Sequence, residues 1–322
     1  MRSSARSRPE EALPPLVVIC GATASGKTRL SLELAERLGR AEIISADSRQ
    51  VFRGMDIGTA KVSAVDRARV PHHGLDLVEP DEPFTAQQFR ANAREALSGI
   101  RRRGRVAILV GGTGLYLRAV ARGLPLEETG SDPALRAALE ERLVGEGLAA
   151  LTAELRRRAP TVAASTDLRN PRRVVRALER ALLLGDRLPP APSGYPAPSV
   201  WLGLSVESGV HDGWIADRAE WQFANGLLDE AARLGARYDP SLRAFSALGY
   251  REAFGVLEGS LTPEQAVEQT ITRTRQFARR QRTWFRAEPD VAWLDAAGDP
   301  LSEAMSLLPV ADLQVAARRR PT

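Results

Sequence analysis

A short glycine-rich segment near the N-terminus has the residue types and spacing of a phosphate-binding loop. Residues 21–28 read GATASGKT and fit the pattern G-x-x-x-x-G-K-[ST]. In this pattern the glycines let backbone N–H groups point inward, the lysine reaches a terminal phosphate, and the final hydroxyl can hold Mg²⁺. The pattern alone does not identify the ligand. The candidate phosphate-binding residues are Gly21, Ala22, Thr23, Ala24, Ser25, Gly26, Lys27 and Thr28.

The segments on both sides of this loop have the required character. LVVIC (16–20) is a short apolar run that is typical of a buried strand. Leu30, Leu34 and Leu38 then recur at helical spacing, and Gly39 follows, which predicts a helix that ends there. A chance glycine turn would not need this order of strand, loop and helix. The positive end of the helix dipole would add to the attraction for phosphate.

Two further candidates follow predicted strands. Asp47 comes directly after the segment IISA (43–46). Because the carboxyl ends of parallel strands form a ligand crevice, we expect Asp47 to face the phosphate-binding loop. It could act as a Mg²⁺-associated carboxylate or a general base, and a helix cap is the structural alternative. GGTG (111–114) is a second glycine turn, where Thr113 and the backbone could contact a substrate or form a purely structural turn.

Arginines form two stripes on predicted helices. One helix begins at the N-cap Asn170 and ends before Gly185, and a later one opens with the capping box TPEQ (262–265). A solvated basic face is the plain alternative, but unpaired stripes beside Phe277 and Trp284 favour a polyanion longer than one nucleotide. The stripes are Arg169, Arg173, Arg176 and Arg180 on the first helix, and Arg275, Arg279, Arg282 and Arg286 on the second.

Composition limits the class of protein. The 322 residues suffice for one large or two modest domains, and the formal net charge is +5. Lys27 and Lys61 are the only lysines, so the positive charge is mostly arginine, and this excess permits nucleic-acid binding without proving it. One cysteine excludes an internal disulfide and fits a reducing compartment. No run has the length of a membrane span and the first residues lack a signal sequence, so we expect a cytoplasmic protein.

The order of the segments predicts an α/β fold with a core like that of P-loop NTPases. Residues 15–123 alternate strand-like and helix-like segments, as in a parallel sheet. Residues 124–198 form a mainly helical insertion that closes with a proline-rich loop, and residues 199–310 comprise a strand that returns to the core and further helices. We expect disordered tails over residues 1–14 and 311–322.

Seven stretches, in order along most of the chain, resemble the bacterial tRNA dimethylallyltransferase (tRNA isopentenyltransferase) family. The combination of ISADSRQV, DIGTAK and RQFARRQRTWF is highly specific, whereas the phosphate-binding loop alone would not be. The seven stretches are GATASGKT, EIISADSRQVFRGMDIGTAK, VPHHGLDLVEPDEPFTAQQF, GGTGLYLRAV, RRVVRALE, GYRE and TRTRQFARRQRTWFR.

The resemblance implies that the loop holds the diphosphate of dimethylallyl diphosphate instead of ATP. The acceptor would be the N6 amine of the adenosine 3′ of the anticodon, presented in the anticodon stem-loop of tRNA, and the enzyme would act as a monomer. Asp47 would accept the proton of the amine, and Thr28 would help to hold Mg²⁺. Lys27 and Thr113 would bind the diphosphate, as would Arg218, in a helix expected to begin near Ile215.

The resemblance also implies a set of tRNA contacts. The adenine has to leave its stack to be reached, and residues after the second strand would touch it or its neighbours. Trp214 departs from the family pattern, in which arginine is usual. The implied contacts near the adenine are Asp47, Ser48, Arg49 and Gln50. The others are Arg136, Arg172, Arg173, Arg176, Gly249, Tyr250, Arg251, Arg279, Arg280, Gln281, Trp284 and Arg286.

Three other functions are weighed against tRNA prenylation. An adenylate isopentenyltransferase would use free AMP or ATP as the acceptor, and the long basic helices argue against it. A P-loop small-molecule kinase would use Asp47 on an acceptor hydroxyl and would not need the arginine stripes. A purely RNA-binding protein would leave the loop and Asp47 unexplained.

Overall fold

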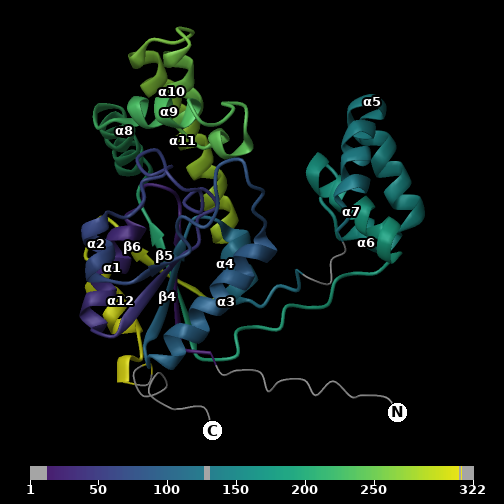
Figure 1. Cartoon of the computed structure of the whole chain (residues 1–322). Coiled ribbons are helices and arrows are strands. Elements are labelled where there is room, and N and C mark those ends of the chain that lie inside the picture. Colours follow the sequence, from purple (N-terminus) through teal and green to yellow (C-terminus); the bar gives the residue numbers. More distant parts are fainter. Residues whose placement is uncertain (1–12, 127–130, 312, 314–322) are drawn as a thin grey trace, which may run out of the picture. The chain divides into compact units, whose positions relative to one another are not determined.

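A parallel β-sheet forms the core of the larger compact unit in the computed structural model, which describes residues 13–126, 131–311 and 313. Its six strands have the order β3-β2-β4-β1-β5-β6. Figure 1 shows the sheet with helices such as α1, α3 and α4 packed around it. The predicted parallel α/β core is confirmed, including the return of the chain to the sheet at β5, which pairs with β1. The strands are β1 (Leu16–Gly21), β2 (Ala41–Ser45), β3 (His72–His73), β4 (Val106–Gly111), β5 (Ser199–Ser205) and β6 (Val291–Asp295).

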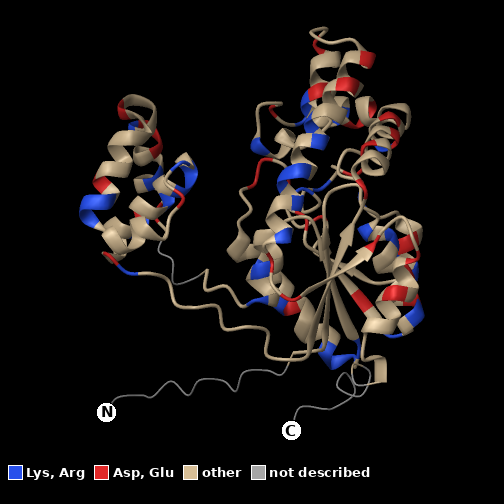
Figure 2. Cartoon of the chain, turned by 180° about the vertical axis from the view of Figure 1, so that it is seen from behind, with Lys and Arg blue, Asp and Glu red and all other residues tan. Residues whose placement is uncertain are grey.

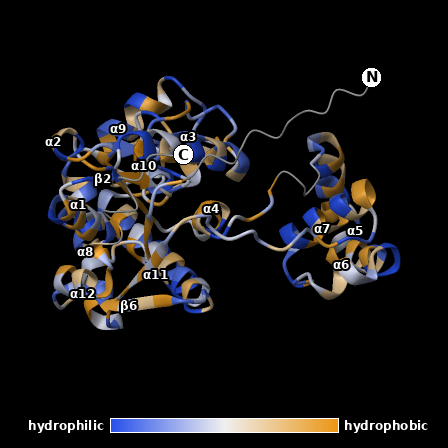
Figure 3. Ribbon diagram, turned by 90° about the horizontal axis from the view of Figure 1, so that it is seen from below, coloured by the Kyte–Doolittle hydropathy of each residue, from blue (hydrophilic) through white to orange (hydrophobic). Residues whose placement is uncertain are grey.

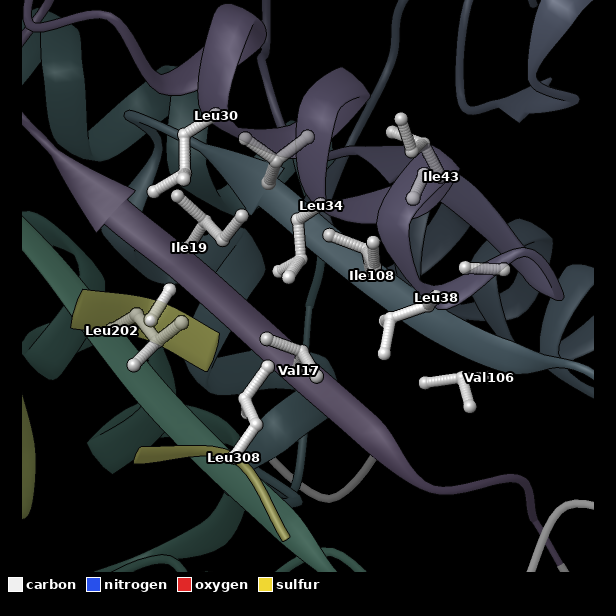
Figure 4. Close-up of a cluster of buried hydrophobic side chains, with 14 of the residues drawn as sticks. Val17, Ile19, Leu30, Leu34, Leu38, Ile43, Val106, Ile108, Leu202 and Leu308 are labelled. Carbon is white, nitrogen blue, oxygen red and sulfur yellow. The ribbon is translucent and has the colours of Figure 1, made fainter. Parts of the chain in front are cut away.

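Helices cover both faces of this sheet, which explains why its central strands are apolar throughout. Every residue of β1 and β4 is buried. On one face Val17 and Ile19 pack with Leu34 and with Leu308 (Figure 4). On the other face Val18 belongs to a second apolar core, and the flanking helices carry both hydrophobic and hydrophilic residues (Figure 3). The first core includes α1 (Lys27–Leu38) and α12 (Pro300–Leu307); the second includes α3 (Ala86–Arg102) and α4 (Gly114–Ala121).

The predicted helix boundaries follow the expected local chemistry. Helix α1 ends at Leu38 because Gly39 adopts a left-handed conformation with a φ of 67°. Thr262 and Gln265 form the predicted capping box. The side chain of Asn170 accepts a hydrogen bond from the backbone N–H of Arg173, as expected of an N-cap.

A third apolar core lies among the helices that follow β5. Leu227 and Tyr250 pack there against Val51 and Met55, which belong to the segment after β2. Short helix α2 (Ala64–Arg69) follows that segment. The helices after β5 are α8 (Ser208–Ala224), α9 (Leu227–Gly235), the 3₁₀ helix η2 (Arg243–Ser246), α10 (Tyr250–Leu257) and α11 (Pro263–Arg286).

Residues Gly123–Ser193 form a separate compact unit, and the rest of the chain forms the other. The unit has its own apolar core, which includes Leu155 and Leu178. The long first helix is kinked at Gly147, whose φ of 82° is outside the helical range. The insertion predicted over 124–198 corresponds to this unit, although the unit ends earlier, at Ser193. Its helices are α5 (Pro133–Arg158), α6 (Pro160–Ala164) and α7 (Pro171–Leu184).

The structure differs from the sequence-based expectations in three places. Helix α8 begins at Ser208 and not near Ile215, because Glu207 caps it by accepting the N–H groups of Gly209 and Val210. Strand β6 was not expected. The expected tails fall largely outside the described residues, but Leu13 packs against the sheet and Leu313 is buried in its core.

Candidate active site

Three adjacent strands bring the candidate residues to the carboxyl-terminal end of the sheet. Strands β2, β4 and β1 are neighbours, and each is followed by one of the predicted motifs: Asp47, GGTG and GATASGKT. The second glycine turn is hydrogen-bonded to the segment that carries Asp47. Ser48 N–H donates to Thr113 Oγ1 at 3.0 Å, and Thr113 N–H donates to the Ala46 carbonyl at 3.3 Å. The three predicted motifs therefore follow the carboxyl ends of neighbouring strands, as expected of a parallel sheet.

The backbone of the first loop leaves helix N–H groups free for an anion. Helix α1 begins at Lys27, and no side chain caps its N-terminus or places an acidic group in its first turn. Gly26 has a φ of 83°, and Ala24 is held at a φ of 58°, which an alanine rarely adopts. At Gly21 a side chain is excluded, since a Cβ would lie 2.9 Å from the Leu204 carbonyl oxygen.

A buried hydroxyl in the same loop lacks a partner. Ser25 is 1% exposed, and its Oγ has no hydrogen-bond acceptor or donor among the described residues. Buried polar atoms are normally satisfied, so an orphan in a phosphate-binding loop fits a site completed by ligand oxygens. The N-terminus of α4 is a second candidate anion site. No side chain caps it, and the first turn of α4 has no acidic residue.

Two cations and one carboxylate share the site. Burial lowers the pKa of Lys27 from 10.5 to about 8, Asp47 opposes this shift, and Arg218 reinforces it. Arg218 Nη1 donates to Thr23 Oγ1 at 3.0 Å, and burial lowers its pKa too, with Asp47 again opposing. In this structure Lys27 Nζ donates to the Ala22 carbonyl. Lys27, Arg218 and Asp47 thus influence one another electrostatically, and their roles toward a ligand stay a prediction.

Asp47 closes a turn instead of capping a helix. Its Oδ1 accepts the N–H of Arg49 at 2.8 Å, and the next helix, α2, begins only at Ala64. The helix-cap alternative is therefore wrong. Oδ2 of Asp47 has no hydrogen-bond partner among the described residues, which leaves one carboxylate oxygen for a substrate.

The residues after Asp47 are held by their own side chains. Arg49 donates to the Arg243 carbonyl at 2.8 Å and to Ser246 Oγ at 2.9 Å, which fixes it to η2. Gln50 accepts from Ser45 Oγ at 2.7 Å and donates to the Thr59 carbonyl at 3.1 Å. This segment is therefore rigidly placed, and its adenine contacts stay a prediction.

Some residues that the resemblance implies as tRNA contacts are instead bound to other parts of the protein. Tyr250 is fully buried, and its hydroxyl donates to Glu230 at 2.5 Å. Gly249 begins α10 at a φ of 90°. Trp284 lies over the second glycine turn, since a Cβ at Gly114 would come within 2.4 Å of its ring. Gln281 contacts both glycine turns through its amide. In this structure the side chains of Tyr250 and Gln281 are not free for tRNA.

The arginine stripe of the insertion is largely paired, contrary to the unpaired stripe expected. Buried Glu179 accepts from both Arg136 and Arg176, and its pKa is held below the ordinary value mainly by the Arg136 hydrogen bond, against the opposing effect of burial. Arg173 is exposed and lies 3.6 Å from Asp167. Arg172 is exposed and has no ion pair within the described part of the chain. Pairing through Glu179 gives Arg136 and Arg176 a structural role within this unit.

The arginine stripe on α11 has fewer acidic partners; Figure 2 marks the basic and acidic positions along the backbone. Arg275 lies 3.6 Å from Asp212, and Arg282 donates to Ser208 Oγ at 3.3 Å. The exposed residues Arg279, Arg280 and Arg286 have no acidic partner in the described ranges. Arg251, at the start of α10, is also exposed and has no acidic partner among the described residues. These four guanidinium groups are available to a polyanion.

Two site residues were missed from the sequence. His211, buried on α8, has Nε2 2.8 Å from the Thr23 carbonyl, and burial lowers its pKa. Glu230 accepts the N–H groups of Asp56, Ile57 and Gly58 and so fixes the loop that holds Gln50. Neither residue has a local sequence signal, because each contacts a segment more than a hundred positions away.

No helix of the described residues is long and apolar enough to cross a membrane. Among those residues there is also no group of three or more histidine, cysteine, aspartate or glutamate side chains that could hold a metal ion. Any metal at this site would therefore depend on ligand and water oxygens as well as on the protein.

This chain is similar to known proteins over most of its length. The family model described as IPP transferase matches residues 50–288. A tRNA dimethylallyltransferase of Geobacter metallireducens is 42% identical over 295 residues, which cover 90% of this chain and 95% of that protein. One of Anaeromyxobacter sp. is 47% identical over 287 residues, with 87% and 92% covered.

Solved structures show the same architecture. A full-length tRNA isopentenylpyrophosphate transferase of Bacillus halodurans is similar with a TM-score of 0.68 and 38% identity, over 94% of this chain and 96% of that one. A eukaryotic dimethylallyltransferase acting on tRNA has a TM-score of 0.75 at 22% identity, over 96% and 81%, and shares the fold. Since the family model matches more than half of the sequence and the relatives align with most of it, this chain belongs to the IPP transferase family.

Proposed function

We propose that this chain is a tRNA dimethylallyltransferase that modifies the N6 amine of the adenosine 3′ of the anticodon. One observation carries the proposal: Asp47, a carboxylate with one unpartnered oxygen, follows β2, and the next two strands of the sheet, β4 and β1, each lead into a glycine turn and an uncapped helix N-terminus. A base beside an anion site suits a reaction that removes a proton and releases diphosphate. The names of the relatives point to the same reaction.

In the proposed step the amine nitrogen forms a bond to the first carbon of the dimethylallyl group. The bond from that carbon to the diphosphate oxygen breaks, and its electron pair leaves with the diphosphate. The amine proton passes to Asp47. Lys27, Arg218 and the N–H groups at the start of α1 stabilise the leaving charge. Binding tRNA with its adenine extruded would place the amine at this edge of the sheet.

We also propose that Mg²⁺ assists. The exposed residue Thr28 follows Lys27 at the start of α1, and a hydroxyl there is a suitable oxygen ligand. Mg²⁺ usually keeps several waters and takes the rest of its ligands from substrate phosphates, which suits a site with few protein carboxylates. The ion would neutralise diphosphate charge. All proposed site residues come from one chain, which supports a monomer, and a tRNA substrate supports a cytoplasmic location.

Replacing Thr28 by alanine should raise the Mg²⁺ concentration that is needed for diphosphate binding. The hydroxyl is the one protein ligand that we assign to the ion, so its loss should shift the Mg²⁺ midpoint by several-fold without changing tRNA affinity. Calorimetric titration of inorganic diphosphate at a series of Mg²⁺ concentrations measures the shift. Thr28→Ser, which keeps the hydroxyl, is the matched control. An unchanged midpoint in the alanine variant would remove Thr28 from the metal site.

Replacing Arg279 and Arg286 together by glutamine should weaken tRNA binding and flatten its salt dependence. The log of affinity falls with log salt by roughly 0.7 to 0.9 per neutralised phosphate, so two lost contacts should reduce the slope by up to about two units. Filter binding between low and physiological salt measures the slope. The double variant Arg37→Gln, Arg94→Gln removes the same charge from exposed positions on α1 and α3 and should leave it unchanged. If wild type and both double variants showed the same salt dependence of tRNA binding, the arginines of α11 would be solvated surface residues without a role in binding.

Transfer of label from dimethylallyl diphosphate tests the proposed function itself. The labelled donor is offered with tRNA, with AMP and with ATP in separate reactions, and a tRNA with guanosine in place of the target adenosine is the control. Label in the adenosine-containing tRNA alone is the expected result. Label in AMP or ATP would indicate an adenylate isopentenyltransferase. Phosphoryl transfer from ATP without prenyl transfer would indicate a kinase.

A further inference from the structure

Gln281 joins the two glycine turns of the active site. Its side chain, 7% exposed, points from α11 into the space between them. Oε1 accepts the N–H of Thr23 in the phosphate-binding loop at 2.8 Å, and Nε2 donates to the carbonyl of Gly112 in the second turn at 2.8 Å. One amide therefore fixes the separation of two loops that lie at the ends of different strands.

The fit around this amide leaves little freedom. A Cβ at Gly112 would lie 2.4 Å from Nε2 of Gln281, so only glycine allows the amide to approach. One turn further along α11, the Trp284 ring covers Gly114, and the Arg118 guanidinium lies 4.4 Å from its centre. Ala278 of α11 packs with Ala22. Helix α11 is thus seated directly on both turns.

Thr23 is the point at which this bridge meets the rest of the site. Its N–H is engaged by Gln281, its carbonyl by His211 and its hydroxyl by Arg218. All three partners come from helices that follow β5, whereas the loop itself follows β1. Loss of one partner would let the loop shift relative to the second turn.

We propose that Gln281 is a positioning residue that holds the diphosphate loop in register with the second glycine turn. The inference rests on the proposed function, and it reassigns a residue that the family resemblance placed among the tRNA contacts. Gln281 directly follows the exposed Arg280, so the helix that carries the proposed tRNA-binding arginines also carries the bridge. A displacement of about 1 Å at a reacting centre can cost about a hundredfold in rate, which makes such a bridge consequential.

Gln281→Leu tests the proposal in the full-length protein, because leucine removes both hydrogen bonds at similar size. The dissociation constant for inorganic diphosphate without tRNA, and the KM for dimethylallyl diphosphate, should rise by about tenfold to a hundredfold. The tRNA dissociation constant at fixed salt should stay within about twofold, and kcat should fall less than kcat/KM. Gln276→Leu is the matched control, since Gln276 is exposed on the same helix.

A double-mutant cycle with Gly112→Ala tests whether the contact itself is responsible. The added methyl group would displace the amide of Gln281 without removing it, so the alanine variant should show the same loss of diphosphate affinity. If both changes act through one contact, the double variant should be no weaker than either single variant, whereas independent effects would multiply. The cycle is also informative if Gln281→Leu folds poorly, because Gly112→Ala keeps the buried amide.

Three results would overturn the proposal: weakened tRNA binding with unchanged diphosphate affinity, multiplicative effects in the cycle, or no difference between Gln281→Leu and Gln276→Leu. The wild-type label-transfer reaction is scored separately. If wild-type protein binds diphosphate but does not prenylate tRNA, the proposed function fails, while a diphosphate defect in Gln281→Leu still supports the bridge.

Discussion

Asp47→Asn should slow single-turnover transfer to tRNA by about 10²–10⁴-fold, the usual contribution of a general base. Asparagine keeps the size of the side chain and an oxygen that can accept the Arg49 N–H, so the turn after β2 should persist. It cannot take a proton from the amine. Rapid-quench measurement with saturating dimethylallyl diphosphate and excess enzyme isolates this step from product release.

Measurements of ligand binding show whether Asp47→Asn loses only its general base or also its folded structure. The dissociation constants of Asp47→Asn for tRNA and diphosphate should stay within a few-fold of wild type. Asp217→Asn is the matched control, because Asp217 is exposed on α8 and has no ion pair or hydrogen bond in the described part of the chain. A rate reduced by less than tenfold in Asp47→Asn would exclude Asp47 as the base.

Lys27→Met should lower the affinity for dimethylallyl diphosphate and kcat/KM by about 10²–10³-fold, the scale of losing one preorganised donor to a developing charge. Methionine preserves the unbranched stem and removes the ammonium. Because burial brings the pKa of Lys27 down to about 8, the wild-type group is charged below that pH and neutral above it. Diphosphate affinity should therefore fall by about tenfold per pH unit above pH 8.

The pH profile makes the assignment specific. The ligand also titrates, so the informative quantity is the ratio of wild-type to Lys27→Met affinity at each pH between 6.5 and about 9.5, the range that spans the lowered pKa. The ratio should be constant below about pH 7 and should fall towards one as the pH rises. The other lysine, Lys61, is buried in ion pairs with Asp56 and Asp76. A ratio that does not vary with pH would mean that Lys27 is not the titrating group.

Local patterns predicted the parts of the site that are built from consecutive residues. The phosphate-binding loop, the second glycine turn and Asp47 each follow a buried strand, and parallel pairing alone brings such ends together. The boundaries of α1 and α11 follow from Gly39 and from the Thr262 capping box. Strand β6 was missed because VAWLD (291–295) is short and lacks a continuous buried run, since Trp293 and Asp295 are exposed.

Contacts between distant segments could not be predicted in this way. Helical periodicity places Gln281 on the inner face of α11, but it does not say that this face meets Thr23, 258 positions earlier. The same holds for Glu230 and the loop at Ile57. The pairing of Arg176 was different, because Glu179 is three residues away on the same helix and a check of such neighbours would have found it.

The place where the helical insertion joins the other unit bears on how such a protein can change in evolution. The chain leaves after Arg122 and returns at Gly194, whose N–H donates to the Arg122 carbonyl at 3.0 Å, and Ser193 N–H donates to the Gly123 carbonyl at 3.2 Å. The first and last residues of the insertion are thus held close together by backbone hydrogen bonds. Loop-closure cost depends only weakly on length, so whatever lies between these residues can be lengthened, trimmed or exchanged with little cost to the sheet. The insertion can therefore vary in length and sequence while the sheet keeps its strand order.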